Sequence, residues 1–511
     1  TLDLRAGSTL STGSLQNTGV IQGSGTLNLG SGTLTNAGTV RPGDGSSTGT
    51  LTVTGQFVQT AGGRIEADVL GTTAAQQDHL NISGSAQLDG ALVLAPASGL
   101  TFGASDRYTV LSCGADGCLS GAFASVNTGG LGVTPTTFSN AISFATGTIA
   151  STWISQTSGF WDVAANWAGG LIPTASTDVV IDQAGDLTVT IRNTSPASNF
   201  TVNSLRSNEN ITITGSTLTL RGDSVINGRL SMTAGTLTIG SQLEVGSMTL
   251  SGGTVSGGRL IASGTGNVLG NGTLSALQLM LGSRLTSTGS GTLSNVTVSR
   301  LGSGSDAGRI VVANGSDLRV VGTLTLDNGS VTLASDGNST FLRSTSGAWS
   351  IAGNGSILFG GSHNAVRASN FLGYGSGTYS LSIGAGVTVS GANGGYIYFG
   401  NNGANAGTIE AVTAGREIVV NAWNTTDTWT NAGTLRANGG ILSLSDAWSS
   451  AGTNARIQLD SGTLFLGGSF NTASFNTLVR PADADRGVLN LVGTLNNANA
   501  TLNLNGATGT L

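Results

Sequence analysis

Residues 429–434 read Trp-Thr-Asn-Ala-Gly-Thr, and residues 448–453 read Trp-Ser-Ser-Ala-Gly-Thr. The two phrases begin 19 residues apart, and a further Asn-Ala-Gly-Thr at residues 405–408 precedes the one at 431–434 by 26. A repeat whose length drifts between about 19 and 26 residues is typical of a coiled sheet, in which each rung supplies two or three short strands. We therefore predict an all-β fold, a long parallel β-solenoid (β-helix).

Short alternating segments and glycine-containing phrases extend this pattern over the chain. Residues 50–54 read Thr-Leu-Thr-Val-Thr, which places Leu and Val on one face of a strand and Thr on the other. β-branched residues and glycines interrupt every window long enough for a helix. The phrase Gly-Thr-Leu begins at Gly25, Gly32, Gly49, Gly235, Gly272, Gly291, Gly322, Gly433, Gly462, Gly493 and Gly509.

Composition separates this chain from ordinary mixed α/β enzymes. It has 82 glycines among 511 residues, no lysine, and 9% charged residues, where soluble proteins average about 25%. The hydrophobic share of 38% argues for a folded chain rather than a disordered one. The net charge is −6 and the arginines are scattered singly, so no basic stripe suits nucleic acid. No apolar run is long enough to span a membrane.

Changes in texture divide the sequence into four segments. We expect solenoid rungs over residues 1–63, a β-sandwich-like or irregular β insertion over 64–150, and a Trp-rich junction over 151–186. The main solenoid is expected over 187–511. We expect the rungs at both ends to leave open edges, so that either the polypeptide continues or copies stack end to end.

The first 150 residues carry a family resemblance. The phrases Asn36-Ala-Gly-Thr-Val40, Gly49-Thr-Leu-Thr-Val-Thr-Gly55, Asp78-His-Leu-Asn-Ile-Ser-Gly84 and Arg107-Tyr-Thr-Val-Leu111 resemble the repeats of bacterial autotransporter passengers and filamentous haemagglutinin-like surface adhesins. The remainder resembles them in general style. The resemblance implies export, a parallel β-solenoid stalk, and a role in adhesion or matrix building.

The two cysteines, Cys113 and Cys118, enclose a turn-like Gly-Ala-Asp-Gly segment. A disulfide at the tip of a hairpin fits this spacing. A metal or redox pair is the alternative, and it is disfavoured because no His or second Cys pair lies nearby in sequence. A disulfide would imply an oxidising, extracytoplasmic location.

Aromatic residues gather between residues 374 and 448, and they supply the candidate ligand contacts. Tyr396 and Tyr398 are predicted to stack on sugar rings, while Asn401 and Asn402 hydrogen-bond sugar hydroxyls. The alternative places the rings in the core as an aromatic ladder. We favour the core for Trp429 and Trp448, because identical register suggests stacked equivalents.

Catalytic groups are sparse. His79 and His363 are the only histidines and lie far apart in sequence, so both are expected to be turn or strand-edge residues. Most aspartates stand beside Gly, Ser or Asn, where the carboxylate usually hydrogen-bonds its own turn. Examples are Asp44, Asp116, Asp306 and Asp336. We expect no enzymatic activity and no cofactor.

Two further motifs are weak. Gly302-Ser-Gly-Ser-Asp306 fits half of a nonapeptide calcium repeat, and Asp483-Ala-Asp485 offers two alternate carboxylates, but such repeats bind calcium only in tandem. Arg221-Gly-Asp223 spells an integrin-binding tripeptide, which a glycine-rich chain produces by chance. We expect no metal site.

The function that this pattern favours is structural and adhesive. We expect an extracellular or bacterial-surface module that associates with itself end to end or between neighbouring rods, with host or environmental glycans as further partners. Nucleic-acid binding and membrane insertion are not expected. The alternative is a carbohydrate-binding or polysaccharide-degrading β-helix protein.

Overall fold

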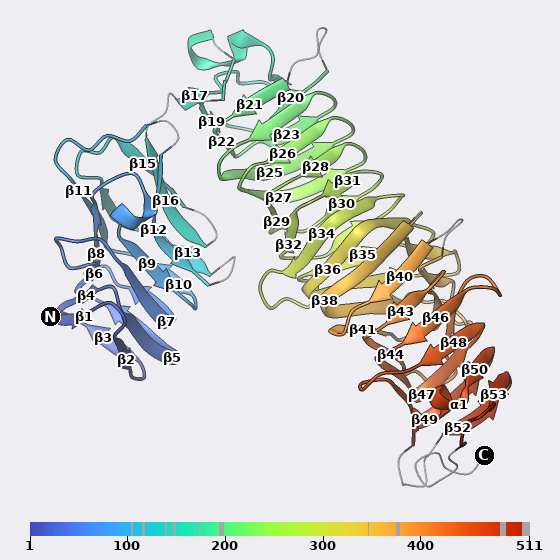
Figure 1. Cartoon of the computed structure of the whole chain (residues 1–511). Coiled ribbons are helices and arrows are strands. Elements are labelled where there is room, and N and C mark those ends of the chain that lie inside the picture. The colour runs from blue at the N-terminus through green and yellow to red at the C-terminus, as the bar shows by residue number, and fades with distance from the viewer. Residues whose placement is uncertain are drawn as a thin grey trace. The chain divides into compact units, whose positions relative to one another are not determined.

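The chain is almost all β and divides into two compact units (Figure 1). The first comprises Thr1–Ala150 with Ser176–Asp178, and the second comprises Ser151–Ala175 with Val179–Leu511. The computed structural model describes residues 1–103, 106–114, 118–137, 140–146, 150–170, 172–175, 177–193, 199–345, 347–374, 379–480 and 487–502.

The first unit contains two stacks of short strands whose pairs are almost all parallel. One sheet has the order β1 (Leu2–Leu4), β4 (Val20–Gly23), β6 (Thr39–Pro42), β8 (Arg64–Val69), β11 (Ala91–Pro96) and β14 (Ser125–Asn127). The other contains β2 (Thr9–Ser11), β3 (Leu15–Asn17), β5 (Thr26–Asn36), β7 (Thr50–Gln59), β9 (His79–Ile82), β10 (Ala86–Leu88), β12 (Arg107–Cys113), β13 (Leu119–Gly121), β15 (Val133–Thr137) and β16 (Ala141–Thr146).

Residues 64–150 are less separate from the preceding rungs than the sequence suggested. β8 pairs in parallel with β6 and β11, and β9 pairs in parallel with β7, so the stack continues across residue 63 without a break. Antiparallel pairing occurs where β16 meets β12 and β15. The change in texture reflects long connections, such as residues 70–78, between strands that keep the inward alternation.

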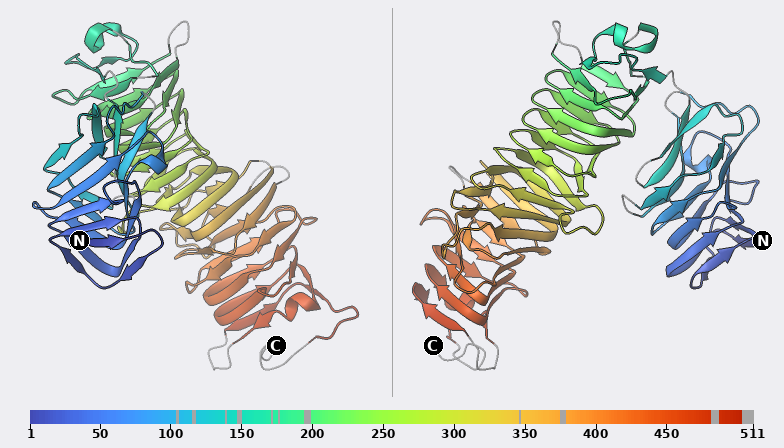
Figure 2. Two further views of the ribbon diagram at one scale, coloured as in Figure 1. Left: turned by 60° about the vertical axis from the view of Figure 1, so that its left-hand side comes forward. Right: turned by 180° about the vertical axis from the view of Figure 1, so that it is seen from behind.

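The second unit is a solenoid-like sheet of 37 strands, β17–β53 (Figure 2). The chain visits three parallel columns in turn, which we call A, B and C. Several long strands continue from one column into the next: β25 (Ser224–Met232), β27 (Gln242–Leu250), β34 (Thr292–Arg300), β36 (Asp317–Ala334), β38 (Gly347–Gly360), β47 (Thr434–Leu444) and β49 (Arg456–Leu466).

The remaining strands belong to single columns. Column A contains β17 (Ala150–Thr152), β19 (Asp178–Ile181), β22 (Ser204–Ser207), β29 (Arg259–Ala262), β32 (Gln278–Leu281), β40 (Tyr379–Ile383), β43 (Gly403–Asn405), β46 (Thr428–Asn431), β48 (Ala447–Ser450), β50 (Ser469–Asn471) and β53 (Thr494–Asn496). Column B contains β18 (Gly159–Phe160), β20 (Thr188–Ile191), β23 (Asn210–Ile213), β30 (Asn267–Leu269), β33 (Leu285–Ser287), β35 (Arg309–Val312), β41 (Val387–Ser390), β44 (Thr408–Ala411) and β51 (Leu478–Val479). Column C contains β21 (Asn199–Val202), β24 (Thr217–Leu220), β26 (Thr236–Ile239), β28 (Thr254–Ser256), β31 (Thr273–Ser275), β37 (Thr340–Arg343), β39 (Asn370–Leu372), β42 (Gly395–Tyr398), β45 (Glu417–Asn421) and β52 (Val488–Leu491). The α-helix α1 (Thr472–Phe475) follows β50.

Register across the rungs is set by the buried face. Leu218 pairs with Leu237, which pairs with Val255, and all three are fully buried. Each such side chain stabilises the fold by about 1.5–3 kcal/mol through burial. The interval between partners ranges from 17 residues, Val245 to Ala262, to 32 residues, Gly347 to Tyr379. This range is wider than the predicted 19–26, because the connections change length while the strands keep their register.

Glycine permits the close approach of successive rungs at the turns. Gly468 has φ +69°, and a Cβ atom there would lie 1.8 Å from the carbonyl oxygen of Asp446 in the rung before it. Only a residue without a side chain fits this position.

Tryptophans begin and continue the core of the second unit. Trp153, Trp161 and Trp167 are fully buried, and the ring of Trp167 makes edge contacts with the other two at 5.1 and 4.8 Å. Farther on, Trp429 pairs directly with Trp448, and their rings stack 6.0 Å apart inside the core. The predicted core location of these two indoles is confirmed.

Buried amides explain the Asn-Ala-Gly-Thr phrases. Asn405 donates from Nδ2 to Oδ1 of Asn431 at 2.8 Å, and Asn431 donates to Oγ of Ser450 at 3.1 Å and to the carbonyl of Gly433 at 3.0 Å. Both asparagines are fully buried. The amides therefore form a ladder that satisfies turn carbonyls while linking successive rungs.

Substitution of Asn431 by Ala is expected to weaken this ladder. The change leaves Nδ2 of Asn405 and the Gly433 carbonyl without their partner, which costs about 1–3 kcal/mol for a buried polar group. Hydrogen exchange on the full chain should show faster exchange of the amides in β46 and β48. Asn193→Ala, an exposed position, should leave these rates unchanged, and equal rates in both variants would contradict the ladder's role.

Candidate functional site

Six aromatic side chains gather on the outer side of column C and at the corner that follows it. We call this group the outer aromatic cluster, and its members are Phe341, Phe371, Tyr374, Tyr396, Tyr398 and Trp423. Phe341, Phe371 and Tyr396 occupy paired positions on β37, β39 and β42. Their rings stack with centroid distances of 5.0 and 5.3 Å. All six side chains are partly exposed.

The strand alternation separates these rings from the core aromatics. Tyr379, Trp429 and Trp448 point inward and are buried, whereas Tyr396 and Tyr398 flank the inward-pointing Ile397. Burial raises the pKa of Tyr379, and burial also raises the pKa of Tyr398. Both tyrosine hydroxyls therefore keep their protons at neutral pH and can donate hydrogen bonds.

The four predicted glycan-contact residues lie close together in the chain. Asn401 and Asn402 are exposed in the turn that follows β42. Asn402 has φ +57° and accepts a hydrogen bond from Oγ1 of Thr428 at 3.3 Å. The backbone N–H of Gly400 donates to the carbonyl of Ala422 at 2.6 Å, which places this turn directly against the Trp423 turn of the next rung.

Sequence reasoning missed how the other rings join these four residues. Tyr374 lies 4.4 Å from Trp423 and 5.5 Å from Tyr398, in both cases edge to face. Phe341 and Phe371 extend the stack toward earlier rungs. The alternation of outward residues in three paired strands could have revealed Phe341 and Phe371 only if the 25- and 30-residue intervals had been known.

The charged groups beside the cluster are matched in pairs. Arg343 lies over the Phe341 ring at 4.5 Å and donates to both oxygens of Asp317, at 2.8 and 2.9 Å. Burial favours a higher pKa for Asp317, but hydrogen bonds and charge from Arg343 and Arg319 outweigh it and keep the pKa below its usual value. The guanidinium of Arg367 binds both oxygens of Glu417 at 2.6 and 2.9 Å.

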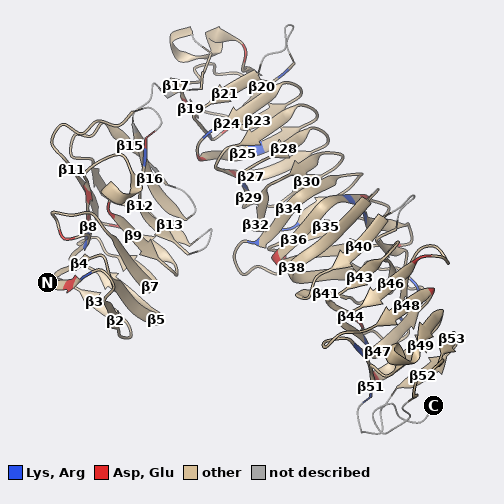
Figure 3. Cartoon of the chain, in the orientation of Figure 1, with Lys and Arg blue, Asp and Glu red and all other residues tan. Residues whose placement is uncertain are grey.

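The cluster combines apolar ring surface with hydroxyl and amide groups and little unbalanced charge. This combination suits neutral, hydroxyl-rich ligands, which bind through ring contacts and hydrogen bonds. Among the described residues, no three His, Cys, Asp or Glu side chains are grouped so as to hold a metal ion. Charged side chains elsewhere are scattered over the strands (Figure 3).

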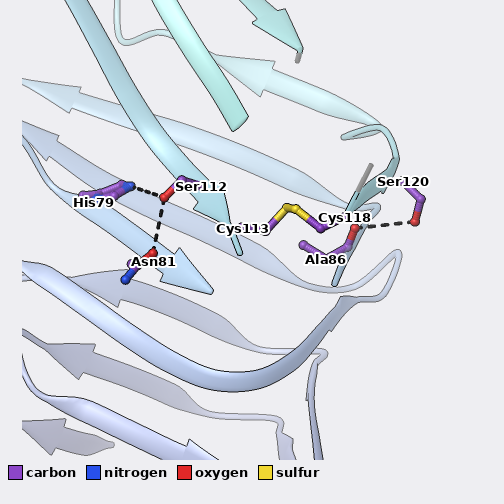
Figure 4. The surroundings of a disulfide bond; sticks show 7 residues. All are labelled: His79, Asn81, Ala86, Ser112, Cys113, Cys118 and Ser120. Atoms are coloured by element: carbon purple, nitrogen blue, oxygen red, sulfur yellow. Dashed lines mark hydrogen bonds between the residues drawn. A yellow bond between two sulfur atoms is a disulfide. The ribbon is translucent and has the colours of Figure 1, made fainter. Parts of the chain in front are cut away.

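A disulfide joins Cys113 and Cys118 in the first unit (Figure 4). Nearby, Nε2 of His79 lies 2.8 Å from Oγ of Ser112, and Ser112 also lies 3.4 Å from Oδ1 of Asn81. Burial lowers the pKa of His79. The described contacts of His79 include no carboxylate hydrogen bond that would orient it as the base of a catalytic triad.

Other sequence motifs prove to be structural where they are described. Arg300 donates to the carbonyls of Gly302, Ser303 and Gly304, so a guanidinium occupies the turn that resembled half a calcium repeat. Asp223 of the Arg-Gly-Asp triplet accepts a hydrogen bond from Ser241 of the next rung. Asp116, Asp483 and Asp485 lie outside the described residues.

Turn aspartates serve two purposes. Oδ1 of Asp44 accepts bonds from the backbone and hydroxyl groups of Ser46 and Ser47, as expected for an aspartate that stabilises its own turn. Asp336 instead accepts from the backbone and hydroxyl of Ser362 in the following rung. Asp306 forms an ion pair with Arg309 at 3.4 Å.

A buried carboxylate that sequence reasoning missed lies in the first unit. Asp78 is fully buried and accepts hydrogen bonds from the backbone N–H groups of Gly49 and Asp68, both at 2.8 Å. Burial raises its pKa to about 7, and the charges of Asp68 and Asp44 add to this effect. No motif announces Asp78, because its burial depends on the connection formed by residues 70–78.

Comparison with protein-family models, with curated proteins and with solved structures finds no match for this chain. Among the described residues, no helix has the length and apolar character needed to cross a membrane.

The buried Asp78 predicts a pH dependence for the first unit. Its folded-state pKa lies near 7, above the unfolded value near 3.8, so the folded state holds the proton longer. The contribution to stability is complete below pH 4 and is lost as the pH rises to 7, by up to about 1.4 kcal/mol per pH unit. Hydrogen exchange of β7 and β9 amides, corrected for intrinsic rates, should report this loss.

Asp78→Asn supplies the matched comparison, because it retains a neutral side chain at every pH. The difference in protection between wild type and variant should change between pH 4 and 7 and be constant above pH 7.5. His79 and Asp68 also have shifted pKa values, but they are present in both proteins. A difference that stays constant from pH 4 to 7 would contradict the raised pKa of Asp78.

Proposed function

We propose that this chain is an extracellular structural and adhesive module built as a long parallel β-solenoid. The observation that carries the proposal is the uninterrupted stacking of rungs, in which aliphatic residues face inward and hydroxyl, amide and glycine residues face outward. Such a stack supplies a stiff surface that offers many weak polar contacts. The low charged fraction makes those contacts less sensitive to salt.

The first rung supports assembly between copies. β1 pairs with β4 alone, and β2 and β3 pair with β5 alone, in the part of the chain that is described. Their outer edges therefore present free backbone N–H and C=O groups. Leu2, Leu10 and Leu15 are only partly buried at this edge. A second copy that adds a rung here would pair the edge and cover the leucines.

Two features support an extracellular location on a bacterial surface. The Cys113–Cys118 disulfide is typical of oxidising compartments. The repeats of the first unit resemble those of autotransporter passengers and haemagglutinin-like adhesins, which are exported.

Carbohydrate binding is the second candidate function, and the outer aromatic cluster favours it. Polysaccharide cleavage has less support, because Asp317 and Glu417 beside the cluster are each held in an ion pair. An acid or base for glycoside cleavage must exchange a proton with the substrate, and a bidentate guanidinium contact opposes this.

Electron microscopy of the purified full chain tests the structural proposal. We expect filaments at micromolar concentration, because unpaired edges associate. Leu10→Lys directs a charge into the open core at β2 and should abolish filaments. Thr9→Lys adds the same charge to the exposed neighbouring position and should leave them intact. Isolated particles of the wild type, or equal filaments from both variants, would count against assembly through this edge.

A further inference from the structure

We propose that the outer aromatic cluster binds a neutral oligosaccharide, with Trp423 as the ring on which a sugar unit stacks. This inference rests on the adhesive part of the proposed function and gives it a ligand class and a site. The argument depends on the backbone of Trp423, on the orientation of its ring and on the charges around it.

Trp423 has a backbone conformation that its side chain disfavours. Its φ is +113°, a region where residues other than glycine are rare and a bulky aromatic residue is an outlier. The surrounding turn enforces this angle. The N–H of Ala422 donates to Asp446 at 3.0 Å, the carbonyl of Ala422 accepts from Gly400 at 2.6 Å, and Asp427 donates to the Asn424 carbonyl at 3.0 Å.

A glycine would meet the same backbone demand without strain, as glycine does at many other turns of this chain. The indole therefore has a use that compensates for the strain, and strained residues of this kind concentrate at functional sites. Core packing does not account for the indole, since Trp423 is partly exposed and packs against the core only from outside.

The ring of Trp423 also differs in orientation from the stacked rings. Phe371 has parallel partners in both Phe341 and Tyr396, so the faces of the stack are occupied by other rings. Trp423 instead meets Tyr374 at 84° and Tyr398 at 83°. Among the described ring contacts, no parallel ring covers a face of this indole, and sugar stacking requires a ring face.

Polar groups of the right kind adjoin the indole. Tyr398 lies 5.3 Å from Trp423, Tyr396 lies 6.0 Å from Tyr398, and the exposed Asn401 belongs to the adjacent rung. Hydroxyl and amide groups both donate and accept, which matches the hydroxyls of a sugar.

The ion pairs decide between neutral and acidic ligands. Arg343 and Arg367 are the arginines in contact with the cluster, and each is bound by two carboxylate oxygens, those of Asp317 and Glu417. Neither guanidinium is available to an acidic sugar without loss of its partner. The site is therefore complementary to an uncharged chain.

Isothermal titration of the full chain with cellohexaose, chitohexaose and mannohexaose tests the proposal, with hexagalacturonic acid as the acidic comparison. We expect at least one neutral hexasaccharide to bind and the acidic one to bind more weakly. Trp423→Ala and Trp423→Gly should each lower the association constant at least tenfold, equivalent to about 1.4 kcal/mol. Trp448→Phe changes a buried ring and should leave binding unchanged.

Thermal unfolding separates the strain from the binding. Glycine tolerates φ +113° and alanine does not, so the Gly variant should melt at a higher temperature than the Ala variant although both lose binding. Absence of binding by all three neutral sugars, stronger binding of the acidic one, or unchanged affinity in Trp423→Ala would overturn the inference. Filaments that bind none of these sugars would refute this site and leave the structural proposal intact.

Discussion

Direct stacking of equivalent side chains in successive rungs is the constraint on which the structure depends. A parallel ladder places each inward residue against the inward residue of the next rung, as with Leu218, Leu237 and Val255. A slip of one residue would turn every aliphatic side chain of that strand outward. The rungs can therefore vary in length only at their corners, and pairing intervals from 17 to 32 residues coexist with unbroken columns.

The same constraint explains which polar residues are buried. Every corner leaves backbone carbonyls near the core, and a buried amide such as Asn431 satisfies them while pairing with its equivalents in adjacent rungs. The first unit uses the same device: Asn17 donates to Asn36 at 2.8 Å, and Asn36 donates to Gln59 at 3.1 Å. Repetition of Asn-Ala-Gly-Thr is thus a consequence of stacking.

Much of this architecture follows from the sequence, because alternation and repeated phrases report local requirements. Trp429 and Trp448 could be assigned to the core, since they share a register in neighbouring phrases. The outer aromatic cluster could be predicted only in part. Tyr396 and Tyr398 are adjacent in sequence, but Phe341, Phe371 and Trp423 join them through corners of unequal length. Asp78 escaped prediction for a similar reason, since its burial arises from a connection between strands.

The outer face of a stacked sheet is under weaker selection by packing than its inner face, so departures from its usual composition carry more information. Hydroxyl and amide residues satisfy that face at little cost to the fold. Six rings on one stretch of column C, two carboxylates neutralised beside them, and one indole held at φ +113° are not required by stacking. Local strain that a glycine would remove, in a chain with 82 glycines, shows that the side chain at position 423 contributes something that the fold alone does not need.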